Sequence, residues 1–416
     1  MSSETGRVLM YTQDSFGLGH LRRATNLANE LVARRADLSV LLVADSPVAP
    51  FFELAPRIDT VKLPTVVKVD AGVYRPGRLH GDYEQVRALR SSLLREIILR
   101  FAPHVLLVDH VPGGANRELV PGLTAIRRRG LRTRVLLGLR DIIDDPAVTC
   151  ALWQREGVYE LLRRNYDHVL VYGAPDVFAT VEEYHIADAM GERVRYCGYL
   201  CNTSPVEEPG SVRARLCVGA EPLVLVMGGG GADAFRVMQT TLEAARILRQ
   251  DRSFATVLVP GPFLPEPERK SLQAQARALG VHTSAGDALG LIQAADVVVC
   301  MAGYNTLSEV LRFEKRAIVV PRPGPSAEQR LRARAFAQRG LLEQLELSSL
   351  EPAALARALG RALDPSFVPA PRAVPALDGL ARASAALLGE LAVALAGRRP
   401  RAPGRRPTAA SSSGAR

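Results

Sequence analysis

The segment VVVCMAGYNTLSEVL, residues 297–311, places small and polar residues between a strand pattern and a helix pattern. A helix that begins at Asn305 or Thr306 would present unpaired backbone N–H groups and the positive end of its dipole, which suit a phosphate. Gly303 lets the backbone approach an anion closely. Glu309 follows on a face that could accept hydrogen bonds from two ribose hydroxyls. Thr306 and Glu309 also have the spacing of a capping box, which needs no ligand.

Four consecutive glycines, residues 228–231, follow the apolar run 223–227 and precede another helix pattern. The loop lacks the Gly-Lys-Ser/Thr of a Walker A sequence. A turn through Gly229 and Gly230 could direct N–H groups at a diphosphate. The alternative is a flexible connector.

A third loop, residues 321–329, follows another apolar run and leads into a helix pattern. Glu328 and Gln329 stand at the start of that helix and could bind the hydroxyls of a sugar. An acid in the first turn is also common because it interacts favourably with the helix dipole. The three loops together predict a site for a nucleotide that carries a sugar.

In the first half of the chain, residues 13–20 read QDSFGLGH and precede a helix. Gly17 and Gly19 have the spacing of a dinucleotide fingerprint, but Arg22 stands at its third position, which requires a small residue. An NAD site with Asp45 as its ribose acid is therefore disfavoured, although it is not eliminated. His20 lies near a helix N-terminus that disfavours its charged form, so it suits a general base. A histidine with only a structural role is the alternative.

Short apolar runs alternate with helix patterns throughout the chain, which predicts doubly wound parallel sheets. The expected strands are residues 8–11, 40–44, 105–108, 135–138 and 169–172, and then 223–227, 255–259, 297–301 and 318–321. Helices are expected at 21–35, 235–249, 306–313 and 330–339. Two such series predict two similar domains, residues 1–202 and 203–375. A C-terminal helix over 376–397 and a disordered basic tail over 398–416 follow.

Composition excludes several classes of protein. The 416 residues are 47% hydrophobic and 23% charged, as in an ordinary globular protein. The net charge is +10, but the tail over 398–416 holds six arginines and no acid, so the folded body is only mildly basic. With 5% aromatic residues the chain lacks a stacking surface for nucleic acid. The five cysteines show no zinc-ligand spacing. The start of the chain lacks a signal-peptide pattern, so we expect a cytoplasmic protein.

Several of these segments resemble the MurG-like family 28 glycosyltransferases, in particular an uncharacterised bacterial branch of predicted glycosyltransferases. They are FGLGHLRRA, GGGGADA, AGYNTLSEVL and VPRPGPSAEQRLRA, together with VDHVPGGANREL and LGLRDIIDDP. The resemblance covers about residues 6–345. It implies a GT-B fold, in which two Rossmann-like domains face each other across a cleft and the second domain binds the donor.

The resemblance also implies roles for single residues. Gly229, Gly230 and Gly303 would line the diphosphate, Asn305 and Thr306 would open the helix beneath the donor, Glu309 would bind the ribose, and Glu328 with Gln329 would bind the sugar. His20 aligns with the histidine of the family's glycine-rich first loop. That loop differs here, which leaves the acceptor and the role of His20 open. Gly17, Gly19 and Asp141 are expected on the acceptor side. The cluster of Asp141, Asp144 and Asp145 is alternatively a solvated loop.

The reaction implied is metal-independent, inverting transfer of a hexose-type sugar from a nucleoside-diphosphate donor, most simply UDP-linked, to an acceptor hydroxyl. His20, Asp14 or Asp109 would act as the base. No cofactor is expected. A nucleotide-sugar hydrolase or 2-epimerase, and a non-catalytic nucleotide-sugar-binding protein, are the alternatives.

The sequence leaves the acceptor open between a lipid-linked sugar and a small molecule. An apolar stripe on the C-terminal helix, at Leu380, Leu387, Leu388, Leu391 and Leu395, precedes the basic tail. Together they could form a peripheral contact with the inner face of the membrane. Packing of this helix against the N-terminal domain is the alternative, and the one favoured.

Overall fold

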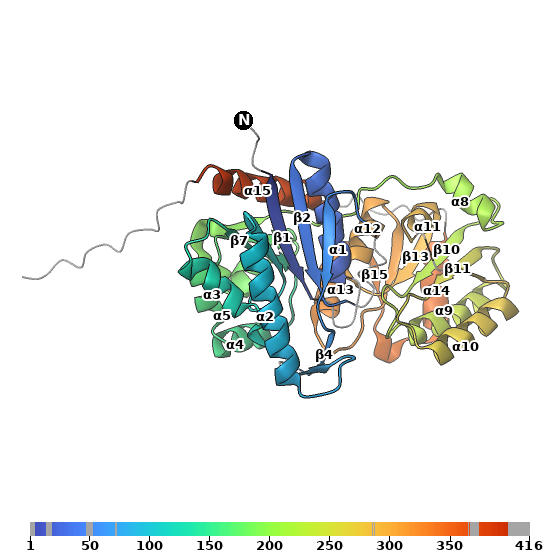
Figure 1. Cartoon of the computed structure of the whole chain (residues 1–416). Helices are drawn as coiled ribbons and strands as arrows, with labels where there is room; N and C mark the ends of the chain where they lie inside the picture. The colour runs from blue at the N-terminus through green and yellow to red at the C-terminus, as the bar shows by residue number, and fades with distance from the viewer. Residues whose placement is uncertain are drawn as a thin grey trace, which may run out of the picture.

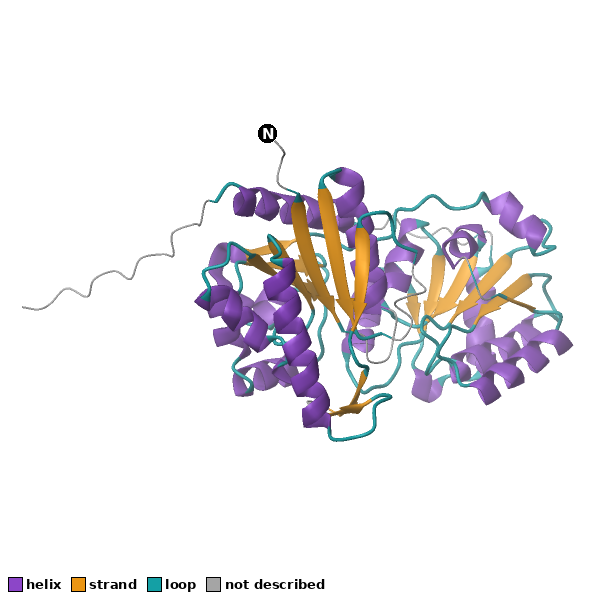
Figure 2. Cartoon of the chain, in the orientation of Figure 1, coloured by secondary structure: helices purple, strands orange, loops and turns teal. Residues whose placement is uncertain are grey.

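The computed structural model describes residues 5–13, 19–46, 53–70, 73–284, 286, 288–364, 366 and 374–397. Two of the predicted site residues, Asp14 and Gly17, and the predicted basic tail lie outside these ranges. Within them the strands form two parallel sheets and a two-stranded hairpin, with helices packed around the sheets (Figure 2).

The first sheet has the strand order β3-β2-β1-β6-β7-β8-β9, and every neighbouring pair is parallel. Its strands are β1 (Gly6–Thr12), β2 (Leu38–Ala44), β3 (Ile58–Lys62), β6 (Val105–Asp109), β7 (Arg134–Arg140), β8 (His168–Tyr172) and β9 (Val194–Tyr196). The antiparallel hairpin consists of β4 (Val66–Asp70) and β5 (Val73–Pro76). The helices of this half are α1 (Gly19–Arg34), α2 (Tyr83–Phe101), α3 (Val120–Arg128), α4 (Pro146–Arg155), α5 (Val158–Asn165), α6 (Thr180–Glu183) and α7 (Ile186–Met190), with the 3-10 helices η2 (Ala115–Arg117) and η3 (Gly191–Arg193).

The second sheet has the order β12-β11-β10-β13-β14-β15 and is also parallel. Its strands are β10 (Leu223–Met227), β11 (Ala255–Val259), β12 (His282–Thr283), β13 (Val297–Cys300), β14 (Arg316–Val319) and β15 (Glu343–Gln344). The helices of this half are α8 (Pro209–Arg215), α9 (Phe235–Leu248), α10 (Glu266–Ala278), α11 (Ala288–Ala294), α12 (Tyr304–Arg312), α13 (Glu328–Gln338) and α14 (Pro352–Ala362), with the 3-10 helix η4 (Leu347–Ser349).

The apolar runs explain these elements. β10 and β13 are buried along their whole length, as expected of strands that have helices on both faces. The predicted apolar face of α1, which includes Leu21, Ala28 and Leu31, is buried in the core of the first domain. The fold is therefore the predicted GT-B arrangement of two Rossmann-like domains (Figure 1). The exact boundary near residue 202 stays a prediction.

In both sheets the order in which the chain adds strands reverses at a comparable point. The order reverses between β1 and β6 in the first sheet and between β10 and β13 in the second. Ligands of doubly wound sheets bind at the carboxyl ends of the strands beside such a switch point. The loop before His20 follows β1, and Asp109 ends β6, whereas the glycine loop follows β10 and Gly303 follows β13. The predicted site residues thus lie at both switch points.

The final helix, α15 (Gly379–Leu395), returns to the first domain and packs against α1, β1, β6, β7 and β8 (Figure 1). Leu387 and Leu391 of its apolar stripe are fully buried there. Glu390 accepts a hydrogen bond from Arg134 Nε at 2.7 Å and lies 3.1 Å from His168 Nε2. The stripe is therefore part of the protein core, as in the favoured prediction, and is not a membrane surface.

The chain crosses between the domains twice, and the two crossings touch. Tyr199 N donates to Ala376 O at 2.7 Å, and Gly379 N donates to Tyr199 O at 3.1 Å. Leu200 and Asp378 form an antiparallel bridge between these segments. A Cβ at Gly379 would lie 2.5–2.6 Å from backbone atoms of the first crossing, so glycine is required for this close approach.

A fully buried ion pair joins the domains at the carboxyl edges of the sheets. Arg332 on α13 donates to both carboxylate oxygens of Asp141, at 2.9 and 2.7 Å, and both side chains have no exposed surface. Arg332 also donates to Ala302 O at 3.0 Å, and Tyr199 Oη donates to Asp141 at 3.0 Å. Burial opposes the charge of Arg332, but the pairing with Asp141 outweighs it and raises the arginine pKa.

We expect Arg332→Met to lower the free energy of unfolding by about 3–5 kcal/mol, because it leaves the buried Asp141 carboxylate without a counter-charge. Urea denaturation at pH 7 followed by circular dichroism measures this. Arg34→Gln is the matched control, since it removes an exposed pair with Glu30 and should cost no more than about 1 kcal/mol. Equal stability of Arg332→Met and the wild type would show that the pair does not hold the domains together.

Candidate active site

A histidine and a carboxylate meet where β1 and β6 end. His20 Nδ1 lies 2.5 Å from Asp109 Oδ2, and the two residues are brought together by the pairing of β1 with β6. Arg23, one turn after His20 on α1, donates to both oxygens of Asp109, with contacts of 3.0 and 2.9 Å. Two of the three residues predicted as bases therefore form one unit.

The charge of Asp109 indicates which ring nitrogen of His20 carries a hydrogen. Burial alone would raise the pKa of the Asp109 carboxyl, but Arg23 and His20 outweigh it and lower the pKa to about 2. Asp109 is thus an ionised acceptor, so His20 Nδ1 is the nitrogen that carries a hydrogen. Arg23 Nη2 also lies 2.9 Å from Nδ1, but two donors cannot form a hydrogen bond with each other. The hydrogen bonds of Arg23 in this unit are therefore those to Asp109. Nε2 is the second nitrogen of the ring.

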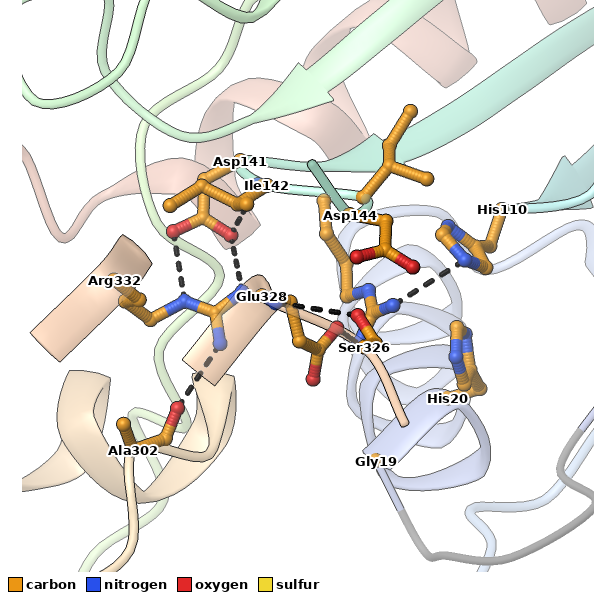
Figure 3. A network of polar contacts seen from close by, with 12 residues as sticks. Gly19, His20, His110, Asp141, Ile142, Asp144, Ala302, Ser326, Glu328 and Arg332 are labelled. Carbon is orange, nitrogen blue, oxygen red and sulfur yellow. Dashed lines mark hydrogen bonds and ion pairs between the residues drawn. The ribbon is translucent and has the colours of Figure 1, made fainter. Parts of the chain in front are cut away.

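A second histidine lies beside the first. The ring centroids of His20 and His110 are 4.9 Å apart, and Arg140 Nη2 donates to His110 Nε2 at 3.2 Å (Figure 3). His110 has a φ of 68°, in the left-handed region that costs energy for a residue with a Cβ. Sequence reasoning missed His110 and Arg140. Each lies in a segment that carries the family resemblance, His110 in VDHVPGGANREL and Arg140 in LGLRDIIDDP. Their presence in these segments could have marked both residues as candidates for the site.

Three of the predicted donor residues converge in the second domain. A Cβ built on Gly229 would lie 3.9 Å from Thr306 Oγ1, and one built on Gly303 would lie 3.7 Å from the same oxygen. The loop at 228–231 is a hydrogen-bonded turn, in which Gly231 N donates to Gly228 O at 2.9 Å. Gly231 has a φ of 92° and packs against Pro260 O too closely for a Cβ. This loop is therefore built into the fold and is not the flexible connector considered above.

Helix α12 begins one or two residues earlier than the predicted start at Asn305 or Thr306. Gly303 is its N-cap residue and Tyr304 its first helical residue, so Thr306 does not cap the helix and the capping-box alternative is wrong. Asn305 Nδ2 instead donates to Gly19 O at 3.1 Å, which ties α12 to the first turn of α1.

Glu309 is 1% exposed, and its Oε1 lies 2.9 Å from Arg22 Nη2 of α1. Arg22 is the residue that broke the dinucleotide fingerprint. Asp45, the acid of that alternative site, is fully buried and lies 3.4 Å from Arg90.

Glu328 and Gln329 begin α13, as expected, and both are buried. Glu328 lies 2.5 Å from Arg140 Nη1 and 3.6 Å from Arg322 Nη2. Burial would raise the pKa of this carboxyl, but the surrounding cations, Arg140 first among them, outweigh it and lower the pKa. Gln329 Oε1 accepts from Arg322 N at 3.2 Å.

The acidic cluster after β7 has structural partners. Asp141 forms the buried pair with Arg332 described above and does not face an open surface (Figure 3). Asp144 accepts from Ala327 N at 2.7 Å, and Asp145 caps α4 by accepting from Ala147 N and Val148 N. Asp141 is therefore not solvated, whereas Asp144 and Asp145 are half-buried, and the acceptor-side role of Asp141 stays a prediction. Sequence reasoning missed the partners of Asp141 and Asp144 because they lie 191 and 183 positions further along the chain.

No group of three His, Cys, Asp or Glu side chains with the geometry of a metal site occurs in the part of the chain that the structure describes. Independence of metal nevertheless stays a prediction about the reaction.

Comparisons with known proteins agree with this geometry. The model of the glycosyltransferase family 28 C-terminal domain matches residues 223–383. A UDP-N-acetylglucosamine--N-acetylmuramyl-(pentapeptide) pyrophosphoryl-undecaprenol N-acetylglucosamine transferase from Rubrobacter xylanophilus is 34% identical over 274 residues, which are 61% of this chain and 78% of that relative. The chain belongs to glycosyltransferase family 28. Transferases of the same name from Trichlorobacter lovleyi and Chlamydia trachomatis align over only 44% and 34% of their own length.

Solved structures confirm the GT-B fold of this family 28 member. MurG from Acinetobacter baumannii aligns with a TM-score of 0.52 at 15% identity, over 95% of this chain and 96% of that one. A protein described as a UDP-N-acetylglucosamine 2-epimerase from Listeria monocytogenes aligns with a TM-score of 0.61 at 14% identity, over 94% and 97% of the two chains. At these identities the likeness concerns the fold alone.

Asp109→Asn should destabilise this family 28 protein by about 3–5 kcal/mol at pH 7, because Arg23 is then buried without a counter-charge. The folded-state pKa of Asp109, about 2, lies below the value of about 3.9 in an unfolded chain. Its contribution to stability is therefore complete above about pH 4 and is lost as the pH falls toward 2. Urea denaturation should show a smaller gap between variant and wild type at pH 3 than at pH 7. A gap that does not change with pH would contradict this.

Proposed function

We propose that this protein transfers a hexose-type sugar from a nucleoside-diphosphate sugar to an acceptor hydroxyl, with inversion and without a metal ion. The observation that carries the proposal is the His20–Asp109 pair at the switch point of the first sheet, next to Gly19, whose carbonyl is bonded to Asn305 at the start of α12 in the second domain. A base and an anion-binding helix start are the two parts that this reaction needs. Membership of family 28 also supports sugar transfer as the function.

In the proposed mechanism, His20 Nε2 takes the proton of the acceptor hydroxyl while Asp109 holds the ring through Nδ1–H. The hydroxyl oxygen bonds to the anomeric carbon from the face opposite the diphosphate. The bond between that carbon and the diphosphate oxygen breaks, and its electron pair leaves with the diphosphate. Attack from the opposite face inverts the configuration.

The donor would be held by the second domain. Backbone N–H groups at the start of α12, next to Gly303, and in the turn through Gly229 and Gly230 would bind the diphosphate and stabilise its developing charge. Glu309 would accept from ribose hydroxyls, and Glu328 with Gln329 from sugar hydroxyls. UDP is the nucleotide named for the family relatives, and we propose it for this donor.

A second candidate function is a 2-epimerase or hydrolase acting on the same donor. The Listeria structure quoted above is described as a 2-epimerase, so the same fold is found in a protein described in that way. Family 28 membership and the base on the acceptor side favour transfer. A protein that binds the donor without turning it over is the remaining alternative.

The acceptor stays open between a lipid-linked sugar and a small molecule. The Rubrobacter relative is named as acting on a pyrophosphoryl-undecaprenol acceptor. None of the described helices combines the length and the apolarity needed to span a bilayer. Because α15 is packed on the first domain, a peripheral membrane contact now rests on residues 398–416, and flotation with anionic vesicles before and after their removal would test it.

Three measurements on the purified protein separate the proposed functions. Thermal shift with UDP, TDP, GDP and their sugars, and with NAD(H), identifies the nucleotide, since a ligand that binds only the folded state raises the melting temperature. Incubation of the donor alone detects hydrolysis or epimerisation. Incubation with a panel of acceptors, with and without EDTA, detects transfer and its need for metal. Binding of no nucleotide sugar would overturn the proposal, and turnover without an acceptor would favour the second candidate.

His20→Ala should lower kcat by about 10²–10⁴-fold, the usual contribution of a general base, while the Kd of the donor stays within about twofold. Steady-state kinetics and donor titration measure the two quantities. His282→Ala, on an exposed strand of the second domain, is the control and should change neither. A kcat that is unchanged in His20→Ala would show that another group is the base.

A further inference from the structure

The first turn of α1 touches the donor-side helix α12 at three places. Gly19 O accepts from Asn305 Nδ2 at 3.1 Å, and Arg22 Nη2 lies 2.9 Å from Glu309 Oε1. The Arg23 guanidinium lies 5.4 Å from the centroid of the Tyr304 ring. The helix that carries His20 is therefore also in direct contact with the helix proposed to bind the donor.

Glu309 has one oxygen engaged and one oxygen without a partner. Oε1 faces Arg22, whereas Oε2 is buried and makes no hydrogen bond to any of the described residues. A buried carboxylate oxygen without a donor is costly unless a ligand supplies one. Glu309 lies three residues after Thr306, on the same face of α12, and Thr306 Oγ1 is the atom around which Gly229 and Gly303 converge. Oε2 thus suits a hydroxyl of the bound nucleotide.

Burial and two arginines set the direction in which the pKa of Glu309 is shifted. Burial is the largest influence and raises the pKa of this carboxyl. Arg22 from α1 and Arg312 from its own helix oppose the rise, and the thiol of Cys201 faces it from the first crossing between the domains. Arg312 is also engaged with Asn202 O and Ser204 O. Arg22 is thus the cation that the opposite domain contributes.

Glu328 repeats the arrangement. This carboxylate of the second domain lies 2.5 Å from Arg140, which ends β7 of the first domain. Each of the two acids proposed to bind the donor is thus paired with an arginine from across the cleft. Glu328 also faces Arg322 of its own domain, so it depends on its cross-domain partner less than Glu309 does.

We propose that Arg22 is a positioning residue for donor binding, supplied by the acceptor-side domain, which acts through Glu309. This inference rests on the proposed function. Arg22 fixes the Glu309 carboxylate by holding Oε1, opposes the burial that raises its pKa, and directs Oε2 to the ribose hydroxyls. The arginine that is incompatible with a dinucleotide fingerprint has this role instead. The donor site is complete only when the first turn of α1 lies against α12, which also brings His20 to the donor.

The test is a titration of the best UDP-sugar, and of UDP, into wild type, Arg22→Gln, Glu309→Gln and the double variant between pH 5.5 and 8.5. Arg22→Gln should weaken binding about tenfold at pH 6 and less at pH 8.5, because Glu309 without its cation takes up a proton at a higher pH. Glu309→Gln should remove this pH dependence. The double variant should bind no more weakly than Glu309→Gln. Arg22→Lys, which restores the positive charge, should recover most of the affinity.

Arg34→Gln, at the other end of α1, is the matched control and should bind like the wild type. If the wild type binds no UDP-sugar, the proposed function fails and this inference fails with it. If the wild type binds and Arg22→Gln matches it at every pH, only this inference is overturned. If Arg22→Gln weakens binding further in the Glu309→Gln background, Arg22 contacts the donor directly and the positioning role is wrong.

Discussion

The buried ion pair between Asp141 and Arg332 fixes how the two domains meet. A buried pair of this kind contributes little net stability compared with an apolar contact of the same shape, but breaking it is costly because one charge is left without a partner. The main effect of the pair is therefore to fix the relative position of the two domains. Arg332 also holds Ala302 O, the carbonyl just before the N-cap of α12. The start of the donor-side helix is thus fastened to the end of β7 in the other domain, and the remaining contacts across the cleft follow from that alignment.

One turn of α1 connects the chemistry with this alignment. His20 faces Asp109, Arg23 neutralises Asp109, and Arg22 faces Glu309 on α12. Four successive residues, 20–23, cover a full helical turn, so neighbours point to different surroundings. The proposed base and the cross-domain contacts therefore belong to one helix. A displacement of α12 relative to α1 would change the proposed donor contacts and the position of His20 at the same time.

The sequence predicted the two sheets well because their central strands are continuous apolar runs, such as β10 and β13. It missed β3, β9, β12 and β15, which are short or at least partly exposed and carry little hydrophobic signal. The loops that follow the strands could be recognised from the sequence, since phosphate-binding and capping chemistry restrict their residue types. The residues that pair with these loop residues in the folded protein could not be recognised. Nothing local in the sequence of Asp141 or Glu309 indicates an arginine on the opposite domain, because that pairing depends on how two separate sheets are docked.

The double crossing of the chain has a mechanical consequence. The second domain is held by two segments that are hydrogen-bonded to each other at Tyr199, Ala376 and Gly379, so they behave as one short joint and not as two independent linkers. Such a joint allows the domains to bend about a line through it and resists twisting and sliding. The cleft would then widen mainly at the edge farthest from the joint.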